Sequence, residues 1–251
     1  MTPDGLRARI LRAEPLVGTF VKTPAYEIIE VLAMSGLDFV CIDAEHAPQD
    51  RRGMDGCLAM AKALGLPALV RVPEGTPAQI LMALDSGAIG VVVPHVDSVA
   101  KAQAIAKSAH FGHGGRGFAG STRWAGQGSK TMPEVLAMDD ETIVLAQIEE
   151  PEGVDAAGGI AATEGIDGLF VGPADMAVCL GKTDAADPAV REAMRTVGTA
   201  AKTNGKAGVT FVPSLDSVPA IRDLGISMFF VGSEHSFMLG AAREVATGFK
   251  A

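Results

Sequence analysis

The feature that most constrains the fold is a regular alternation of short apolar runs with helix-like stretches. Eight such runs occur, at residues 16–21, 37–43, 68–72, 89–94, 143–148, 166–171, 207–211 and 228–231. Their Val, Ile and Leu content is typical of strands buried on both faces. Helix-like stretches lie between them, at residues 24–35, 52–64, 77–85, 98–108 and 188–203. Strands that alternate with helices predict βαβ units and a mainly parallel sheet.

Eight strand–helix units in 251 residues match a (β/α)8 barrel, the TIM-barrel class, in number and in size. A doubly wound open sheet is the competing fold, and the count of eight favours the barrel. No Gly-, Pro- or Ser-rich linker divides the chain, so residues 1–251 are predicted to form one α/β barrel domain. The tail from Glu234 onward predicts an extra C-terminal helix, and packing of that helix on a neighbouring subunit is left open.

Composition argues against several classes of protein. The chain carries 21 Lys and Arg against 30 Asp and Glu, and its net charge of −9, without a basic stripe, argues against nucleic-acid binding. No apolar run is long enough to span a membrane, and the charged N-terminus lacks the apolar core of a signal peptide. Cys41, Cys57 and Cys179 are too few and too scattered for a disulfide framework or a cysteine-rich zinc site. These features predict a cytoplasmic protein without nucleic-acid or membrane partners.

Polar side chains gather where the predicted strands end, and in a parallel barrel that end carries the active site. Strand alternation puts Gln147 and the following Glu149 on one face. Other runs end in Asp43-Ala44-Glu45-His46, in Arg71 and in Gly172-Pro173-Ala174-Asp175. Taken singly, each has an ordinary alternative: a solvated loop glutamate, a loop histidine, a structural ion pair or a helix cap. Because four strands deliver ionisable groups to one end, a polar active site is the favoured interpretation.

These strand-end groups suggest one chemistry. Glu149 and Asp175 offer hard carboxylate oxygens to a divalent cation such as Mg²⁺ or Mn²⁺. Arg71 would be a fixed cation beside a developing oxyanion such as an enolate, and His46 is a candidate proton carrier. The turn into the helix after residue 172 offers the backbone N–H groups of Ala174 and Asp175 to a carboxylate. Together they describe enolisation of a 2-keto acid.

At these residues the chain resembles a known family. The segments are FVCIDAEHAPQD (39–50), LVRVP (69–73), GVVVPHVDS (90–98), AQIEEPEGV (146–154) and LFVGPADMAVCLG (169–181). They look like the HpcH/HpaI aldolase family, and within it the metal-dependent (class II) pyruvate aldolases, which act on acids such as 4-hydroxy-2-oxoheptanedioate and 2-dehydro-3-deoxyglucarate. The resemblance implies a (β/α)8 barrel, a divalent metal ion (Mg²⁺, Mn²⁺ or Co²⁺) and a homohexamer whose C-terminal helices are exchanged between neighbours.

Carried over to this sequence, the resemblance makes Glu149 and Asp175 the metal ligands. Pyruvate would chelate the metal through its carboxylate and keto oxygens. Its carboxylate would lie in the turn at Gly172, held by the backbone N–H groups of Ala174 and Asp175. Gln147 would sit beside the metal-bound water and the substrate.

The resemblance also assigns the groups that handle charge and protons. Arg71 would stabilise the enolate oxygen. His46 would pair with Asp85 as a dyad that moves protons through metal-bound water, and Asp43 would orient the dyad or the hydroxyl of the aldehyde. Read without the resemblance, Asp85 in LMALDSG is only an acidic residue at a helix end.

A Gly-rich segment, residues 112–128, keeps the Arg-Gly and Arg-Trp elements of the family but looks shorter than in relatives that act on dicarboxylate-derived aldehydes. We expect it to lie over the mouth of the barrel and to contact the aldehyde. Arg123 would then bind an anionic acceptor. The alternative is a surface arginine beside a structural Trp124, and Arg116 has the same ambiguity.

Two further residues at strand ends are left open. Lysines are sparse at the predicted strand ends, which argues against a Schiff-base aldolase, and Lys22 after the first run is the exception. His95 ends the fourth run, where solvation in a loop is favoured over a place in the site.

These observations predict a class II aldolase that reversibly cleaves 4-hydroxy-2-oxo acids to pyruvate and an aldehyde through a metal-stabilised enolate. It would be a carbon–carbon lyase with small-molecule substrates. The alternatives are a related enolate-forming lyase of the citrate-lyase or malyl-CoA type, and a non-catalytic barrel that binds keto acids.

Overall fold

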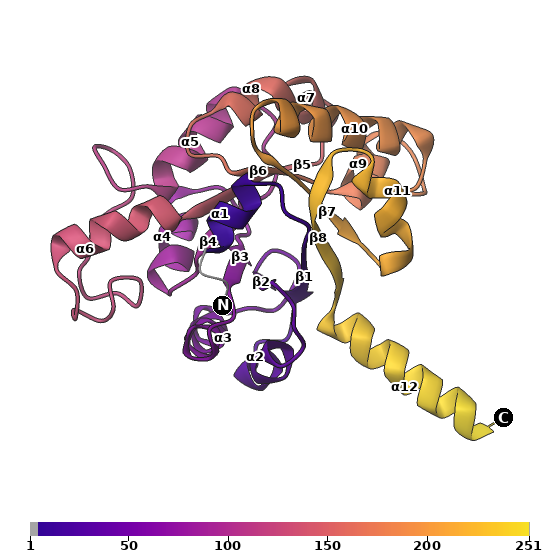
Figure 1. The fold of residues 1–251 in the computed structure, drawn as a ribbon, viewed down its shortest axis with the longest axis horizontal. Coiled ribbons are helices and arrows are strands. Elements are labelled where there is room, and N and C mark those ends of the chain that lie inside the picture. The colour runs from indigo at the N-terminus through magenta and orange to yellow at the C-terminus, as the bar shows by residue number, and fades with distance from the viewer. Residues whose placement is uncertain (1–4, 251) are drawn as a thin grey trace.

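The strands close into a parallel barrel at the centre of the molecule (Figure 1). The computed structural model describes residues 5–250. The strands are β1 (Leu16–Val21), β2 (Phe39–Asp43), β3 (Ala68–Arg71), β4 (Gly90–Val93), β5 (Ile143–Ile148), β6 (Gly168–Val171), β7 (Ala207–Val212) and β8 (Ile226–Ser233). Each strand pairs in parallel with the next, and β8 pairs with β1 to close the barrel. The predicted (β/α)8 barrel is therefore confirmed.

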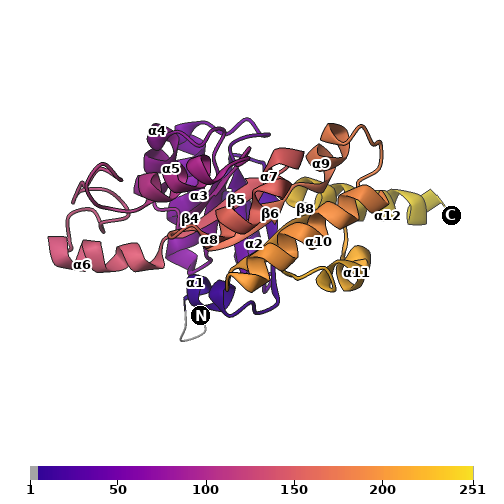
Figure 2. The same ribbon diagram turned by 90° about the horizontal axis from the view of Figure 1, so that it is seen from above.

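Most of the helices pack around the outside of the barrel (Figures 1 and 2). The α-helices of the described residues are α1 (Leu6–Leu11), α2 (Tyr26–Ala33), α3 (Arg51–Leu64), α4 (Pro77–Asp85), α5 (Val99–Ala109), α6 (Met132–Ala137), α7 (Pro151–Asp155), α8 (Ala157–Ala162), α9 (Pro173–Cys179), α10 (Pro188–Thr203), α11 (Val218–Arg222) and α12 (Glu234–Lys250). Short polar side chains begin four of them, because Asp50, Thr76, Ser98 and Asp187 each accept a backbone N–H from the first turn of the helix that follows.

The interior of the barrel is filled by aromatic side chains. Phe230 stands at the centre, with its ring centroid 4.9 Å from those of Phe39 and Phe170 and 5.0 Å from that of Phe20. Gly18 makes room for this packing, because a Cβ at that position would lie 2.4 Å from the Phe39 ring. The barrel is therefore a packed core, and ligands can reach it only at its ends.

Helix α1 closes the N-terminal end of the barrel. Leu6 and Ile10 pack into the interior cluster, and Arg7 Nη2 lies 2.8 Å from Oδ1 of the fully buried Asp167. The other oxygen of Asp167 accepts the backbone N–H of Val144 at 2.9 Å. With this end covered, the carboxyl end of the strands is the open end.

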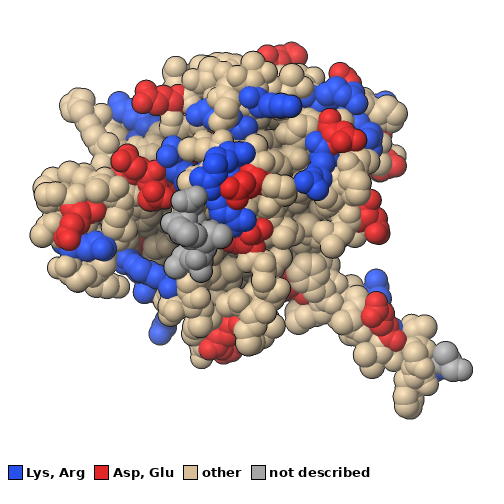
Figure 3. All heavy atoms as spheres, viewed as in Figure 1, with Lys and Arg blue, Asp and Glu red and all other residues tan. Residues whose placement is uncertain are grey.

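Helix α12 projects away from the barrel (Figures 1 and 3). Its apolar side chains are largely exposed in the single chain, including Phe237, Met238 and Leu239, with Val245 at 74% and Phe249 at 92%. The predicted C-terminal helix is confirmed. Among residues 5–250, no helix combines the length and the hydropathy needed to cross a bilayer.

Candidate active site

A cavity of about 340 Å³ opens at the carboxyl end of the barrel. Its walls come from the ends of β1, β3, β5, β6, β7 and β8 and from the loops that follow the strands. Six residues predicted from the sequence line it: His46, Arg71, Gln147, Gly172, Ala174 and Asp175. The strand ends therefore converge on one cavity, as the sequence predicted.

Arg71 and Asp43 form a buried, bidentate ion pair on one side of this cavity. Nε of Arg71 donates to Oδ1 of Asp43 at 3.0 Å and Nη2 donates to Oδ2 at 2.8 Å. Arg71 is 6% exposed, and its guanidinium stacks over the Phe20 ring at 4.4 Å. Burial alone would raise the pKa of Asp43, but the hydrogen bonds and charge of Arg71 outweigh it and lower that pKa. Asp43 thus stays ionised and holds the guanidinium in place.

Asp43 also shapes the loop that carries His46. Its Oδ1 accepts the backbone N–H of His46 at 3.1 Å and that of Glu45 at 3.3 Å. The His46 ring lines the cavity and is 55% exposed, with Nε2 3.7 Å from Oε2 of Glu45. His46 therefore lies at the rim, where solvent and cavity meet.

Glu149 is a buried carboxylate without a cationic Lys or Arg partner among the described residues. It is 2% exposed. Its Oε1 accepts the backbone N–H of His95 at 2.9 Å, and its Oε2 accepts a hydrogen bond from Nε2 of Gln147. These two donors orient the carboxylate, and Nδ1 of the His95 ring lies 3.1 Å from Oε1. A buried carboxylate with no Lys or Arg partner in the described part of the chain suits a metal ligand.

Asp175 meets Glu149 beside Gly172. Asp175 lies in the first turn of α9, and the turn at Gly172 directs its side chain back toward the strand ends. A methyl group at Gly172 would lie 3.1 Å from Oε2 of Glu149 and 3.4 Å from Oδ2 of Asp175. Both oxygens therefore border the same small space, which only a residue without a side chain leaves open.

A second group of candidate metal ligands shares Glu149. Glu45, His95 and Glu149 each place one ligand atom within 4.8 Å of the others. Burial raises the pKa of Glu45 more strongly than the charge of Arg71 lowers it. Glu45 had no role in the sequence prediction. Strand alternation could have identified Glu45, because it places Glu45 on the same inward face as Asp43, two residues earlier.

His95 contacts Glu149 through its backbone and through its ring. Its φ of 57° lies in the left-handed region, and this conformation directs the N–H to Glu149. Nδ1 of the ring lies 2.6 Å from Oε1 of Glu150, and this hydrogen bond raises the pKa of His95. The ring is 60% exposed, but its Nδ1 also lies 3.1 Å from Oε1 of Glu149. His95 therefore borders the site with ring and backbone, which the favoured prediction of a solvated loop histidine missed.

The predicted pair of His46 and Asp85 is absent from the single chain. Asp85 ends α4, and a helix that follows a barrel strand runs back to the other end of the barrel. There its Oδ1 accepts a hydrogen bond from Nη2 of Arg116 at 2.7 Å. His46 lies at the carboxyl end of the strands, so the two residues do not pair within one chain, and the dyad stays a prediction.

The Gly-rich segment is also at the N-terminal end, not over the mouth of its own barrel. It leads from the end of α5 toward α6 and the start of β5. Nη2 of Arg123 lies 2.8 Å from both carboxylate oxygens of Asp55, and Nε donates to the Ser86 carbonyl at 3.0 Å. Arg123 therefore does not line this cavity within one chain. In the single chain it is a structural arginine beside the buried Trp124, as the alternative interpretation held.

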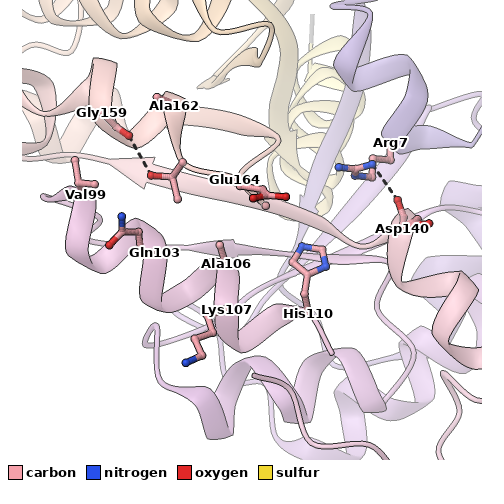
Figure 4. Close-up of a pocket in the computed structure, with 12 residues that line it drawn as sticks. Arg7, Val99, Gln103, Ala106, Lys107, His110, Asp140, Gly159, Ala162 and Glu164 are labelled. Atoms are coloured by element: carbon pink, nitrogen blue, oxygen red, sulfur yellow. Dashed lines mark hydrogen bonds between the residues drawn. The ribbon is translucent and has the colours of Figure 1, made fainter. Parts of the chain in front are cut away.

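A larger groove of about 720 Å³ lies on the outer helices, between α5, α8 and the start of the chain (Figure 4). Its polar groups largely serve the fold: Arg7 donates to the Asp140 carbonyl at 2.9 Å and Thr163 to the Gly159 carbonyl at 3.0 Å. None of the strand-end residues lines it. The smaller cavity at the barrel mouth is therefore the candidate active site.

Comparisons with known proteins agree with this geometry. Residues 16–241 match the family model described as HpcH/HpaI aldolase/citrate lyase. The chain belongs to the HpcH/HpaI aldolase/citrate lyase family. A 5-keto-4-deoxy-D-glucarate aldolase from Klebsiella pneumoniae is 33% identical over 99% of this chain and 97% of its own. The crystal structure of an HpcH/HpaI aldolase/citrate lyase family protein from Burkholderia cenocepacia J2315 superposes with a TM-score of 0.93. The two sequences are 33% identical, and the match covers 98% of this chain and 99% of that chain. For an HpcH/HpaI aldolase from Desulfitobacterium hafniense DCB-2, the TM-score is 0.90, the identity 25% and the coverage 98% and 96%.

Membership of the HpcH/HpaI family, with aldolases among its full-length relatives, makes this chain a carbon–carbon lyase. Class II aldolases of this kind use a divalent metal ion. The group of Glu45, His95 and Glu149 at the mouth of the barrel could hold such an ion.

Proposed function

We propose that this chain is a metal-dependent aldolase that reversibly cleaves 4-hydroxy-2-oxo acids to pyruvate and an aldehyde, with residues 1–251 forming one catalytic domain. The observation that carries the proposal is the meeting of Glu149 and Asp175 beside Gly172, at the wall of the cavity that Gly172 and Arg71 line. Two carboxylates that no described Lys or Arg contacts, with a fixed cation at the same mouth, suit a substrate that becomes an enolate.

Glu149 and Asp175 would hold the metal, which we propose is Mg²⁺, Mn²⁺ or Co²⁺. The fit rests on their donor set, because hard carboxylate oxygens suit these ions and the backbone N–H of His95 and the Gln147 amide keep Glu149 oriented. Oε1 of Gln147 is buried and accepts no hydrogen bond within the described chain, so it is free for a ligand's donor. A bound divalent ion would supply a Lewis acid for the 2-keto oxygen.

The residues of this chain would divide the remaining work. In cleavage, the C4 hydroxyl loses its proton, the C3–C4 bond breaks, and its electron pair passes into the pyruvate enolate. Arg71, fixed by Asp43, would place positive charge beside the enolate oxygen as that charge develops. The backbone from Gly172 to Asp175 would receive the carboxylate of the substrate. A proton returned to C3 then completes pyruvate.

His46 is the proposed proton carrier, because its ring lies at the rim and reaches both cavity and solvent. Within one subunit Asp85 is at the other end of the barrel. The paired role proposed for Asp85 therefore requires the Asp85 of a second copy of the chain, and the same holds for contact of Arg123 with an aldehyde.

We propose that the chain is a homo-oligomer, a hexamer, in which α12 packs on a neighbouring copy. The exposed apolar side chains of α12, such as Phe249 and Val245, support this because they find no cover on their own barrel. We further propose a cytoplasmic location, which suits the three free cysteines, Cys41, Cys57 and Cys179.

The test is release of pyruvate from a panel of 4-hydroxy-2-oxo acids, followed with a coupled lactate dehydrogenase. We expect turnover that is lost on chelation, restored by Mg²⁺, Mn²⁺ or Co²⁺, and reduced at least about 100-fold in Glu149→Gln. Glu164→Gln, an exposed residue outside the cavity, is the matched control and should keep full activity. Turnover that survives both chelation and Glu149→Gln would contradict the proposal.

A further inference from the structure

Lys22 is a cation in the candidate active site that the mechanism above does not use. It directly follows β1, lines the cavity and has a side chain that is 31% exposed. Its Nζ lies 3.6 Å from Oδ2 of Asp43, which is beyond hydrogen-bonding distance, and it donates no hydrogen bond to any described residue. The ammonium thus keeps its donors for a ligand.

Arg71, the other Lys or Arg that lines the described cavity, is differently engaged. Two of its nitrogens donate to Asp43, and Nη1 lies 3.3 Å from Oε2 of Glu45. Arg71 is a fixed positive charge that two hydrogen bonds already tie to Asp43. Lys22 is the one of the two whose side chain donates no hydrogen bond within the described chain.

Buried Glu234 fixes the backbone at Lys22. Glu234 is 3% exposed and accepts the N–H of Lys22 at 2.9 Å and that of Thr23 at 2.6 Å. These bonds tie the end of β1 to the start of α12. The backbone of Lys22 is therefore held in place before any ligand binds, which reduces the entropy lost on binding.

The position of Lys22 in the barrel indicates which end of a substrate its side chain would contact. In a closed ring of eight strands, β1 lies opposite β5, and Glu149 directly follows β5. A substrate whose 2-oxo acid end is held near Glu149 and Asp175 extends across the mouth toward β1. The wall beside Lys22 also carries the hydroxyl groups of Ser233 and Ser236.

We propose that Lys22 is a specificity-determining residue that binds an anionic group, a carboxylate or a phosphate, at the far end of the substrate. That group belongs to the aldehyde fragment after cleavage. The inference rests on the proposed aldolase function and adds to it the residue that would select 4-hydroxy-2-oxo acids with a second anionic group. A lysine suits either anion, because its ammonium acts as a point charge.

The test compares aldehydes of matched size in condensation with pyruvate. Succinic semialdehyde carries a carboxylate, butanal is its neutral counterpart, and glycolaldehyde phosphate tests the other anion. For Lys22→Met we expect the ratio of kcat/KM for the preferred anionic aldehyde over butanal to fall about 10- to 100-fold. Lys22→Arg should recover much of the ratio, and exposed Lys202→Met is the matched control that should not change it.

A fall of equal size for charged and neutral aldehydes would overturn the proposal, because it would assign Lys22 a structural role. A wild-type enzyme without preference for either anionic aldehyde would overturn it too. Circular dichroism checks that the Met variant folds, and Lys22→Gln carries the same comparison if it does not. Deuterium exchange into the methyl group of pyruvate needs no aldehyde. If the wild type catalyses exchange but Lys22→Met leaves the kcat/KM ratio unchanged, only the role of Lys22 is refuted. If the wild type catalyses neither exchange nor condensation, the aldolase function is refuted.

Discussion

Replacing Arg71 with methionine should leave Asp43 as a buried carboxylate without its main partner. Asp43 is fully buried and receives two hydrogen bonds from the guanidinium. Removal of one partner of a buried ion pair costs about 3–5 kcal/mol of stability. Lys22, 3.6 Å from Oδ2, still offsets part of the charge, so we expect a loss near the lower figure, about 3 kcal/mol.

A double variant separates the charge from the packing of the stem on Phe20. If the cost arises from the stranded carboxylate, Asp43→Asn combined with Arg71→Met should be at least about 1 kcal/mol more stable than Arg71→Met alone. Urea unfolding at pH 7, followed by circular dichroism at one protein concentration, measures these free energies of unfolding. A double variant as unstable as the sum of the two single variants would refute the reasoning.

The same pair predicts a pH dependence. Because the pKa of folded Asp43 is below its ordinary value, its contribution is complete above the unfolded aspartate pKa of about 3.9. That contribution is lost as the pH falls from there through the lowered folded pKa. Stability of the wild type should therefore decrease more steeply than that of Asp43→Asn as the pH falls below about 4, in matched urea titrations.

Three further predictions concern the surroundings of the site. Gly172→Ala places a methyl group 3.1 Å from Glu149 Oε2 and should weaken Mn²⁺ binding about 10-fold by isothermal titration calorimetry; unchanged affinity would argue against a metal there. His95→Ala should be about 1 kcal/mol less stable than His95→Gly in thermal melting, because glycine adopts the positive φ without strain; equal melting points would remove the reason given for the conformation. Arg7→Ala should cost about 1–3 kcal/mol by stranding buried Asp167, discounted because Arg7 is 28% exposed, while Mn²⁺ affinity stays at the wild-type value.

The barrel could be predicted from the sequence because its strands are buried on both faces. Such strands read as unbroken apolar runs, and all eight runs overlap a strand of the structure. The short helices were harder. α1, α6, α7 and α8 have five or six residues each, too few for a helical period to stand out from the surrounding loops.

The site was predictable where side-chain direction follows from strand alternation. Gln147, Arg71 and Asp43 face inward because alternate residues of a barrel strand do so. Glu45 obeys the same rule and was missed because the neighbouring His46 offered more obvious chemistry. The contact of the His95 backbone with Glu149 could not be predicted, since it depends on a left-handed conformation that a non-glycine residue rarely adopts.

Two predicted site residues lie away from the mouth of their own barrel for a reason of topology. Asp85 ends α4 and the Gly-rich segment follows α5, and helices in this fold return the chain to the N-terminal end of the barrel. A resemblance in sequence carries residue roles but not the subunit that supplies each residue. The direction of each connection would have shown that Asp85 and Arg123 cannot reach the mouth of their own barrel.

The central claim is that Glu149 and Asp175 hold the metal ion that pyruvate enolisation needs. Its most direct test is deuterium exchange into the methyl group of pyruvate in D₂O, followed by mass spectrometry. We predict that the wild type catalyses exchange, that chelation abolishes it, that added Mg²⁺ or Mn²⁺ restores it, and that Glu149→Gln fails to respond to the metal. Exchange that continues at the full rate after the metal has been removed would contradict the account.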